Sequence, residues 1–235
     1  MEKQDVLMND NDAPKNPEIQ NQNNTKPIQE VKEKQNSQIF NAICFLELEY
    51  TDPDPNSENC RICEISIILM NQNLTQSYPV ADYIIDTNPE FVTDPYVKQR
   101  LVSSGLWNDM QDPNKCITLT DAEQLIIQQL QEYKILKGST PSAGIQAYQD
   151  RILTERFMPE LDKFLNFMQS NTCLIEQFYR IIDISSLDDV AERFNKNAFR
   201  NKDQNSKPNL QRTQYNIQKA INRLRNYKKS LLKSK

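Results

Sequence analysis

The chain has 235 residues, of which 37% are hydrophobic and 26% are charged, and its formal net charge is −4. This length allows one well-packed core, and no apolar run approaches the roughly 20 residues that a membrane-spanning helix needs. The chain has no histidine, which excludes sites that use a histidine base or ligand. Its five cysteines are scattered and odd in number, so we expect free thiols rather than a disulfide framework.

Residues 1–38 contain thirteen Asn or Gln residues and few large apolar ones. Such a segment buries too little apolar surface to fold, so we expect a disordered polar tail. It has neither the apolar core of a secretory signal nor the arginines of a mitochondrial presequence. We therefore expect one folded domain over 39–235 and an intracellular protein.

The first part of this domain reads as three consecutive strands. Residues 39–49 are almost all apolar and predict a buried strand. A Pro- and Asp-rich turn at 52–56 follows it. Further strands are predicted over 62–69 and 78–85, joined by the turn at 71–73. Connections this short are typical of a three-stranded meander.

The rest of the domain alternates helices and strands. We expect a helix from a capping box at Thr120-Asp121-Ala122-Glu123 to about Leu136. Its apolar stripe consists of Leu125, Ile126, Leu130 and Tyr133. After it we expect, in chain order, a strand near 142–147, a helix from about Asp150, a strand over 180–184 and a short helix capped at 186–189. The pattern predicts an α/β domain with a mixed sheet flanked by helices.

The last predicted helix, over about 210–232, is amphipathic and basic. From Lys207 onward there are nine Lys or Arg residues and no acid. Two interpretations stay open: the cations contact nucleic acid or a partner, or they form a solvated face favoured by the helix dipole. Its apolar face holds Ile217, Ala220, Ile221, Leu224, Tyr227 and Leu231, and its candidate binding residues are Lys219, Arg223, Arg225, Lys228 and Lys229.

Two carboxylates in the first strand are the strongest chemical signal. Glu47 and Glu49 are two positions apart, and side chains alternate along a strand, so both lie on one face. Two acids on a buried face repel each other unless a cation lies between them. This arrangement is typical of the first half of a two-metal nuclease site.

Several motifs, taken in order, resemble oligoribonuclease, the small-RNA exonuclease of the DEDDh group, which has a ribonuclease H-like fold. The resemblance covers about Ile39 to Leu232. Its motifs are Glu47-Leu48-Glu49-Tyr50-Thr51 for the family's Asp-Leu-Glu-Met-Thr, Ile62-Cys63-Glu64-Ile65 for Ile-Ile-Glu-Ile, Ser104-Gly105-Leu106 for Ser-Gly-Leu, Gly144 to Arg151 for Gly-Asn-Ser-Ile-Gly-Gln-Asp-Arg, and Tyr179 to Ser185 for Tyr-Arg-Tyr-Leu-Asp-Val-Ser. We expect a ribonuclease H-like exonuclease fold.

The resemblance also implies a degenerate site. The family's first Asp, its Glu and its middle Asp fall on Glu47, Glu49 and Asp150. The closing His and Asp fall on Gln211 and Asn216, and no acid follows Asp203 anywhere. Loss of a general base alone costs about 10²–10⁴ in rate. We therefore predict a pseudoenzyme with no catalytic residues.

The remaining carboxylates leave two interpretations. Glu47, Glu49 and Asp150 hold one divalent ion, or they are inherited groups with raised pKa values; we expect the second, with no metal and no cofactor. Cys60 and Cys63 have metal-like spacing, but no second pair completes four ligands, so we expect structural cysteines.

Substrate handling is eroded in part. Pro53, Leu101 and Gln146 stand where the family has its wedge leucine, a phosphate-side histidine and a serine. Arg180 and Ser185 still match the phosphate-end residues, so we keep them as candidate contacts to nucleic acid or a partner.

The leading hypothesis is a structural subunit held in a stable hetero-complex that modifies or processes nucleic acid. One specific form is an accessory subunit of a nuclear DNA adenine methyltransferase complex, although no motif favours it over an RNA-processing or ribosomal assembly. Two alternatives are a stand-alone DNA- or RNA-binding module and a residual metal-dependent exonuclease completed by a partner. We expect no membrane association, and a nuclear location rather than a cytoplasmic or mitochondrial one.

Overall fold

The computed structural model describes residue 39 and residues 41–166, 180–195 and 212–231. The chain divides into two units between Gln35 and Asn36, and everything described below belongs to the second unit. The predicted tail over 1–38 and the candidate residue Gln211 lie outside the described residues.

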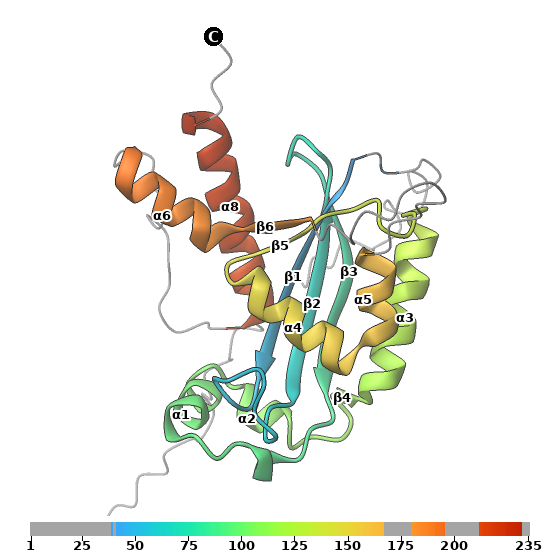
Figure 1. Ribbon diagram of the computed structural model, residues 1–235. Coiled ribbons are helices and arrows are strands. Elements are labelled where there is room, and N and C mark those ends of the chain that lie inside the picture. Colours follow the sequence, from blue (N-terminus) through green and yellow to red (C-terminus); the bar gives the residue numbers. More distant parts are fainter. Residues whose placement is uncertain (1–38, 40, 167–179, 196–211, 232–235) are drawn as a thin grey trace, which may run out of the picture. The chain divides into compact units, whose positions relative to one another are not determined.

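A mixed sheet forms the centre of the domain (Figure 1). Its strands are β1 (Ile43–Tyr50), β2 (Ile62–Met70), β3 (Ser77–Ile85), β4 (Cys116–Ile117), β5 (Ser142–Gly144) and β6 (Ile181–Asp183), in the order β4-β3-β2-β1-β5-β6. The first three pair antiparallel, which confirms the predicted meander, and β5 and β6 add parallel strands beside β1. The α/β class and the mixed sheet are therefore confirmed.

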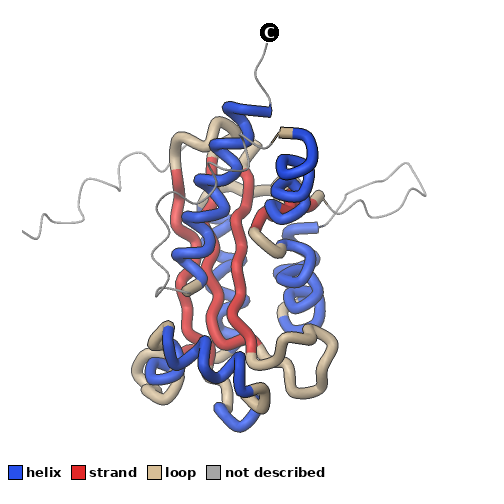
Figure 2. Tube along the Cα trace, turned by 90° about the vertical axis from the view of Figure 1, so that its left-hand side faces the viewer, coloured by secondary structure: helices blue, strands red, loops and turns tan. Residues whose placement is uncertain are grey.

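Helices cover both faces of this sheet (Figures 1 and 2). They are η2 (Pro89–Phe91), α1 (Pro95–Ser103), α2 (Leu106–Asp109), α3 (Leu119–Glu132), α4 (Ala147–Phe157), α5 (Pro159–Asn166), α6 (Ile184–Phe194) and α8 (Thr213–Leu231). Helices α3, α4 and α5 pack on one face, and α8 packs on β1, β2 and β5 on the other, with α6 beside it. None of the described helices is both long and apolar enough to cross a bilayer.

Alternation along β1 sends its side chains to two cores. Cys44, Leu46 and Leu48 belong to the core with α3, α4 and α5. Phe45 belongs to the core with α6 and α8. By the same alternation Glu47 and the residues two positions either side of it face α8. The strand that carries the predicted carboxylates is thus buried on both faces.

The outer edge of the meander has little pairing. Strand β4 pairs only with Ile84 and Ile85 of β3, in the part of the chain that the structure describes. Pro79 lies within β3, and its carbonyl accepts a hydrogen bond of 2.9 Å from the Tyr133 hydroxyl. This segment of β3 is therefore an edge strand that contains a proline.

Helix α3 begins and ends earlier than predicted. Its N-cap is Thr118, whose hydroxyl accepts a hydrogen bond from the Asp121 amide, so the predicted capping box was placed two residues too late. The helix stops at Glu132, and Lys134 takes a φ of +56°, a left-handed conformation that ends a helix. Leu125, predicted in the apolar stripe, is 42% exposed.

Other boundaries also differ from the prediction. Strand β1 begins at Ile43 rather than residue 39, and β6 is shorter because Ile184 already belongs to α6. The cap of α6 is Asp183, which accepts the Ser186 amide at 3.0 Å, so the short helix starts before the predicted cap at 186–189. The meander and α8 are confirmed as elements; α8 runs over 213–231.

A buried ion pair joins α6 to α8. Arg223 is 6% exposed, and its Nη1 lies 2.9 Å from Asp188 Oδ2. The Tyr227 hydroxyl also donates to Asp188. Arg223 was predicted as a cation for nucleic acid or a partner; its charge is instead directed into the interior, so it is not a surface residue.

We expect Arg223→Met to lower the free energy of unfolding by about 3–5 kcal/mol, because it leaves the Asp188 carboxylate buried without its cation. Urea denaturation followed by circular dichroism measures this loss. The exposed Arg193 of α6 provides the control, and Arg193→Met should stay within about 0.5 kcal/mol of wild type. Equal effects of the two changes would contradict the assigned role of the pair.

Candidate functional site

A row of polar side chains interrupts the apolar sheet on the face that carries α8. We call Glu47, Glu49, Glu64, Ser66 and Asp82 the acidic floor. Glu47 pairs across the strands with Ser66, and Ser66 with Asp82, while Glu49 pairs with Glu64. The floor therefore extends over β1, β2 and β3 in two adjacent cross-strand rows, or ranks: Glu47, Ser66 and Asp82 form the first, and Glu49 and Glu64 form the second.

The second rank holds two buried acids directly opposite each other. Glu49 and Glu64 are each 2% exposed. Like charges at opposed positions destabilise a sheet, and a low-dielectric setting strengthens their repulsion. Each carboxylate therefore needs a positive charge close by.

Arg100 of α1 supplies that charge to Glu49. Its Nη2 lies 2.9 Å from Glu49 Oε2, as an ion pair rather than a well-directed hydrogen bond. The guanidinium carbon also lies 5.6 Å from the centre of the Tyr50 ring, a cation–π distance. The positive group beside the family's glutamate position is thus a side chain of this chain.

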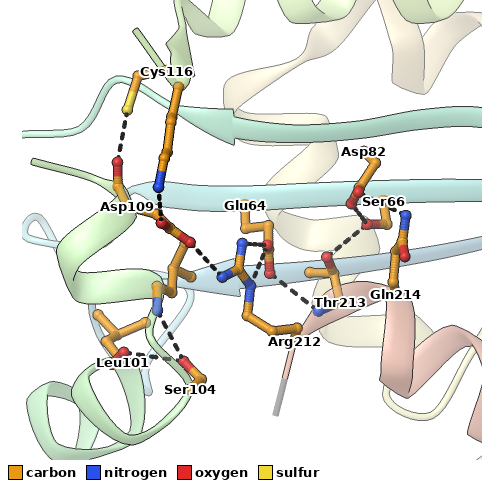
Figure 3. A network of polar contacts seen from close by, with 12 residues as sticks. Glu64, Ser66, Asp82, Leu101, Ser104, Asp109, Cys116, Arg212, Thr213 and Gln214 are labelled. Atoms are coloured by element: carbon orange, nitrogen blue, oxygen red, sulfur yellow. Dashed lines mark hydrogen bonds and ion pairs between the residues drawn. The ribbon is translucent and has the colours of Figure 1, made fainter. Parts of the chain in front are cut away.

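Arg212, just before α8, supplies the charge to Glu64 (Figure 3). Its Nε donates to Glu64 Oε1 at 2.6 Å, and its Nη2 contacts the same oxygen. Its Nη1 donates to Asp109 Oδ2 of α2 at 2.8 Å, and the other oxygen of Asp109 lies 2.7 Å from Lys115 Nζ. One guanidinium therefore bridges the sheet and α2.

The first turn of α8 continues these contacts along the floor (Figure 3). The Thr213 amide donates to Glu64 Oε2 at 3.1 Å, and its hydroxyl lies 2.6 Å from the Ser66 hydroxyl. Gln214 Nε2 donates to Asp82 Oδ2 at 2.6 Å, and Ser66 donates to Asp82 Oδ1. A cavity of about 370 Å³ opens beside this turn, partly lined by Asp82 and Gln214.

Three carboxylates and one amide of the predicted site come together. Asp150 of α4 is 3% exposed and acts electrostatically on Glu47, and the Asn216 side chain forms a hydrogen bond with Glu47. Glycine at 144 leaves room beside this cluster, since a Cβ there would lie 2.9 Å from the Leu46 carbonyl oxygen and 3.4 Å from Asp150 Oδ2. The structure therefore brings Glu47, Glu49, Asp150 and Asn216 near one another.

Burial controls the protonation of these acids. It raises the pKa of Glu47 to about 8, with repulsion from Glu49 as the next cause. It raises the pKa of Glu49 to about 7, although Arg100 opposes this rise. It also raises the pKa of Asp150 well above its usual value. A protonated Glu47 is therefore favoured near neutral pH.

These residues do not fit the family's two-metal centre. The closing position is a neutral amide, Asn216, and Arg100 already neutralises Glu49. Within the described ranges, no group of three or more acidic, histidine or cysteine side chains is arranged to hold a metal ion. One oxygen each of Glu47, Glu49 and Asp150 is buried without a hydrogen-bond partner in the described part of the chain.

The other predicted binding residues make contacts within the chain. Arg180 donates to the Gly138 carbonyl at 2.9 Å, and the Ser185 hydroxyl contacts the Ile145 carbonyl. On α8, Arg225 Nε donates to the Leu74 carbonyl at 2.8 Å. The remaining lysines lie at the surface or partly buried: Lys219, Lys228 and Lys229.

The cysteines with metal-like spacing are separate from this site. Cys60 and Cys63 are buried free thiols, and their sulfur atoms contact the backbone carbonyls of Asp52 and Arg61. Burial raises the pKa of Cys60 to about 11, which keeps its thiol protonated.

Sequence reasoning missed Arg100, Arg212 and Glu64. Both arginines act across long sequence distances, and Arg100 lies on a helix that the sequence pattern did not predict. Glu64 did leave a signal, because it alternates with Ser66 as a polar period of two in an otherwise apolar strand.

Comparison with known proteins gives the same family as the motifs. No family model matches the chain. A protein named probable oligoribonuclease from Caenorhabditis elegans is 25% identical over 195 residues, covering 82% of this chain and 90% of its own length. An oligoribonuclease from Bordetella pertussis is 27% identical over 200 residues, covering 82% and 97%.

Solved structures show the same fold. Exonuclease I from Methylocaldum szegediense aligns with a TM-score of 0.56 and 12% identity over 82% of this chain. A product-bound exonuclease I aligns with a TM-score of 0.57 and 9% identity. This chain spans 41% and 44% of those two chains. The ribonuclease H-like α/β fold and these relatives, which align along most of the chain, support an oligoribonuclease-like DEDDh exonuclease family for this protein.

Proposed function

We propose that this chain is an inactive exonuclease-like protein that serves as a structural subunit of a larger complex that modifies or processes nucleic acid. The observation that carries the proposal is the ion pair between Arg100 and Glu49 within the acid cluster. A protein cation lies there, beside a closing position that is the neutral Asn216.

The Arg100–Glu49 ion pair and the neutral Asn216 bear directly on two-metal hydrolysis. Two divalent ions activate water and stabilise the leaving oxygen only when ionised carboxylates hold them. Here burial raises the pKa of Glu47 to about 8, which favours its protonated form near neutral pH, and burial also raises the pKa of Asp150. The general base is missing as well, since the chain contains no histidine.

A protein partner is supported by an exposed apolar pair on α6. Val190 is 45% exposed and Phe194 is 82% exposed, and residues four apart lie on the same side of a helix. Large apolar side chains of this kind mark surfaces that another protein can cover. Partner candidates are chains of a nucleic-acid-processing assembly in the nucleus, of which an adenine methyltransferase complex is one specific form.

The alternative of a stand-alone nucleic-acid-binding module has less support. Arg223 is buried, and Arg225 contacts the turn after β2. Lys228 contacts Asn73 in the same turn at 3.3 Å. These three cations of the basic helix α8 therefore contact groups of their own chain.

Affinity purification of the tagged protein from native extract should recover a fixed set of partners in stoichiometric amounts by mass spectrometry. Phe194→Glu should reduce that recovery, because it places a charge in the apolar contact. The matched control is Leu136→Glu in the loop after α3, where Leu136 is 63% exposed. Recovery of the wild type only as a free monomer would overturn the proposal.

Purified protein should release no nucleotides from a short single-stranded RNA in Mg²⁺ or Mn²⁺ beyond the buffer background. Glu49→Gln should leave that background unchanged, because no ion depends on this carboxylate. Mononucleotide release measured by chromatography that requires a divalent ion and disappears in Glu49→Gln would instead establish a residual exonuclease.

Stability should fall as pH rises from about 5 to about 8. Folding raises the pKa of Glu47 from 4.5 to about 8, so in this window the folded state binds a proton that the unfolded state does not. Glu47→Gln should flatten the slope of unfolding free energy against pH by up to about 1.4 kcal/mol per pH unit. Denaturant titrations at several pH values measure it, with the exposed Glu192→Gln as control. Equal slopes in both variants would contradict a buried proton on Glu47.

A further inference from the structure

We propose that Arg100 and Arg212 are the resident counter-cations of the acidic floor, in place of divalent ions, and that they make the floor a clamp holding α8 and the α1–α2 pair on the sheet. The inference rests on the proposed function, because a floor that bound catalytic ions would not be closed by arginines. It adds a role to that proposal: the former site now fastens the fold together.

The charge arrangement supports two fixed cations. Glu49 and Glu64 are cross-strand neighbours, and each has its own guanidinium, from Arg100 and Arg212 respectively. Arg212 also lowers the pKa of Glu49, so its field extends to the second acid. The two arginines thus compensate this cross-strand pair of buried acids.

The start of α8 matches the floor position by position. Arg212 and Thr213 bond to Glu64, Thr213 also contacts Ser66, and Gln214 bonds to Asp82. One helical turn further on, Asn216 bonds to Glu47. Four residues in a stretch of five therefore contact four floor residues on three strands, which fixes the position of α8 along the sheet.

The same arginines hold the α1–α2 pair. Arg100 extends from α1 to Glu49 on β1. Arg212 contacts Asp109 of α2, which is also paired with Lys115. Three parts of the chain that are distant in sequence therefore meet at two guanidinium groups. Removal of either group leaves a buried carboxylate without its partner, which is strongly destabilising.

Hydrogen exchange on the full chain tests the clamp. Arg212→Gln should speed exchange of the amides in the first turns of α8 by roughly tenfold or more, because those turns lose their anchor. Arg212→Lys, which keeps the charge but not the bridging geometry, should fall between this variant and wild type. The matched control is Arg225→Gln, also on α8, whose contacts are to Leu74 and Asn222. Equal exchange in Arg212→Gln and Arg225→Gln would overturn the clamp.

Divalent-ion binding tests the counter-cation role separately. The melting temperature of the wild type should not change in millimolar Mg²⁺ or Mn²⁺, because the positions near Glu49 and Glu64 are already compensated. The double variant Arg100→Ala with Asn216→Asp removes one resident cation and restores one acid, so it should gain stabilisation by Mn²⁺. Stabilisation of the wild type, or none in the double variant, would overturn this role. Nucleotide release by the purified protein would contradict the proposed function but not the clamp. Hydrogen exchange and melting temperature, which test the clamp, do not depend on catalytic activity.

Discussion

The structure depends on one electrostatic constraint: two glutamates, Glu49 and Glu64, face each other inside a sheet that is covered on both sides. A single buried carboxylate can accept a proton, but two opposed ones need either shared protons or cations. The chain meets this requirement with guanidinium groups from outside the sheet. The placement of α1, of α2 and of the start of α8 follows from where those groups must lie.

The same constraint supports the proposal that this chain keeps the exonuclease fold without the exonuclease chemistry. The family resemblance extends over most of the chain, and the exonuclease fold is retained. At its centre, however, Glu49, Glu64, Ser66 and Asp82 contact groups within the chain. Buried polar networks are stable only when each member has a partner, and such a network fixes one arrangement of the elements around it.

Sequence reasoning succeeded where the pattern is local and periodic. The three strands of the meander and the long α8 have clear periods of two and 3.6, and both were predicted. Helices α1 and α2 are short, and their signals lie in capping chemistry: Asp94 caps α1, and Gly105, with a φ of +78°, precedes α2. The family motifs identified Glu47, Glu49, Asp150 and Asn216, but no local pattern contains the arginines that pair across the fold. Arg223 was misjudged from charge alone, although its spacing from Ala220 and Tyr227 places it on the buried side of the helix.

The proline in β3 has a consequence for how this protein can assemble. An edge strand can recruit a strand from another molecule only through free N–H and C=O groups. Pro79 has no N–H to give, and its carbonyl already accepts the Tyr133 hydroxyl. At this position the edge therefore cannot donate a backbone hydrogen bond to an added strand. A contact with another chain at this position of the edge must therefore use side chains rather than backbone pairing.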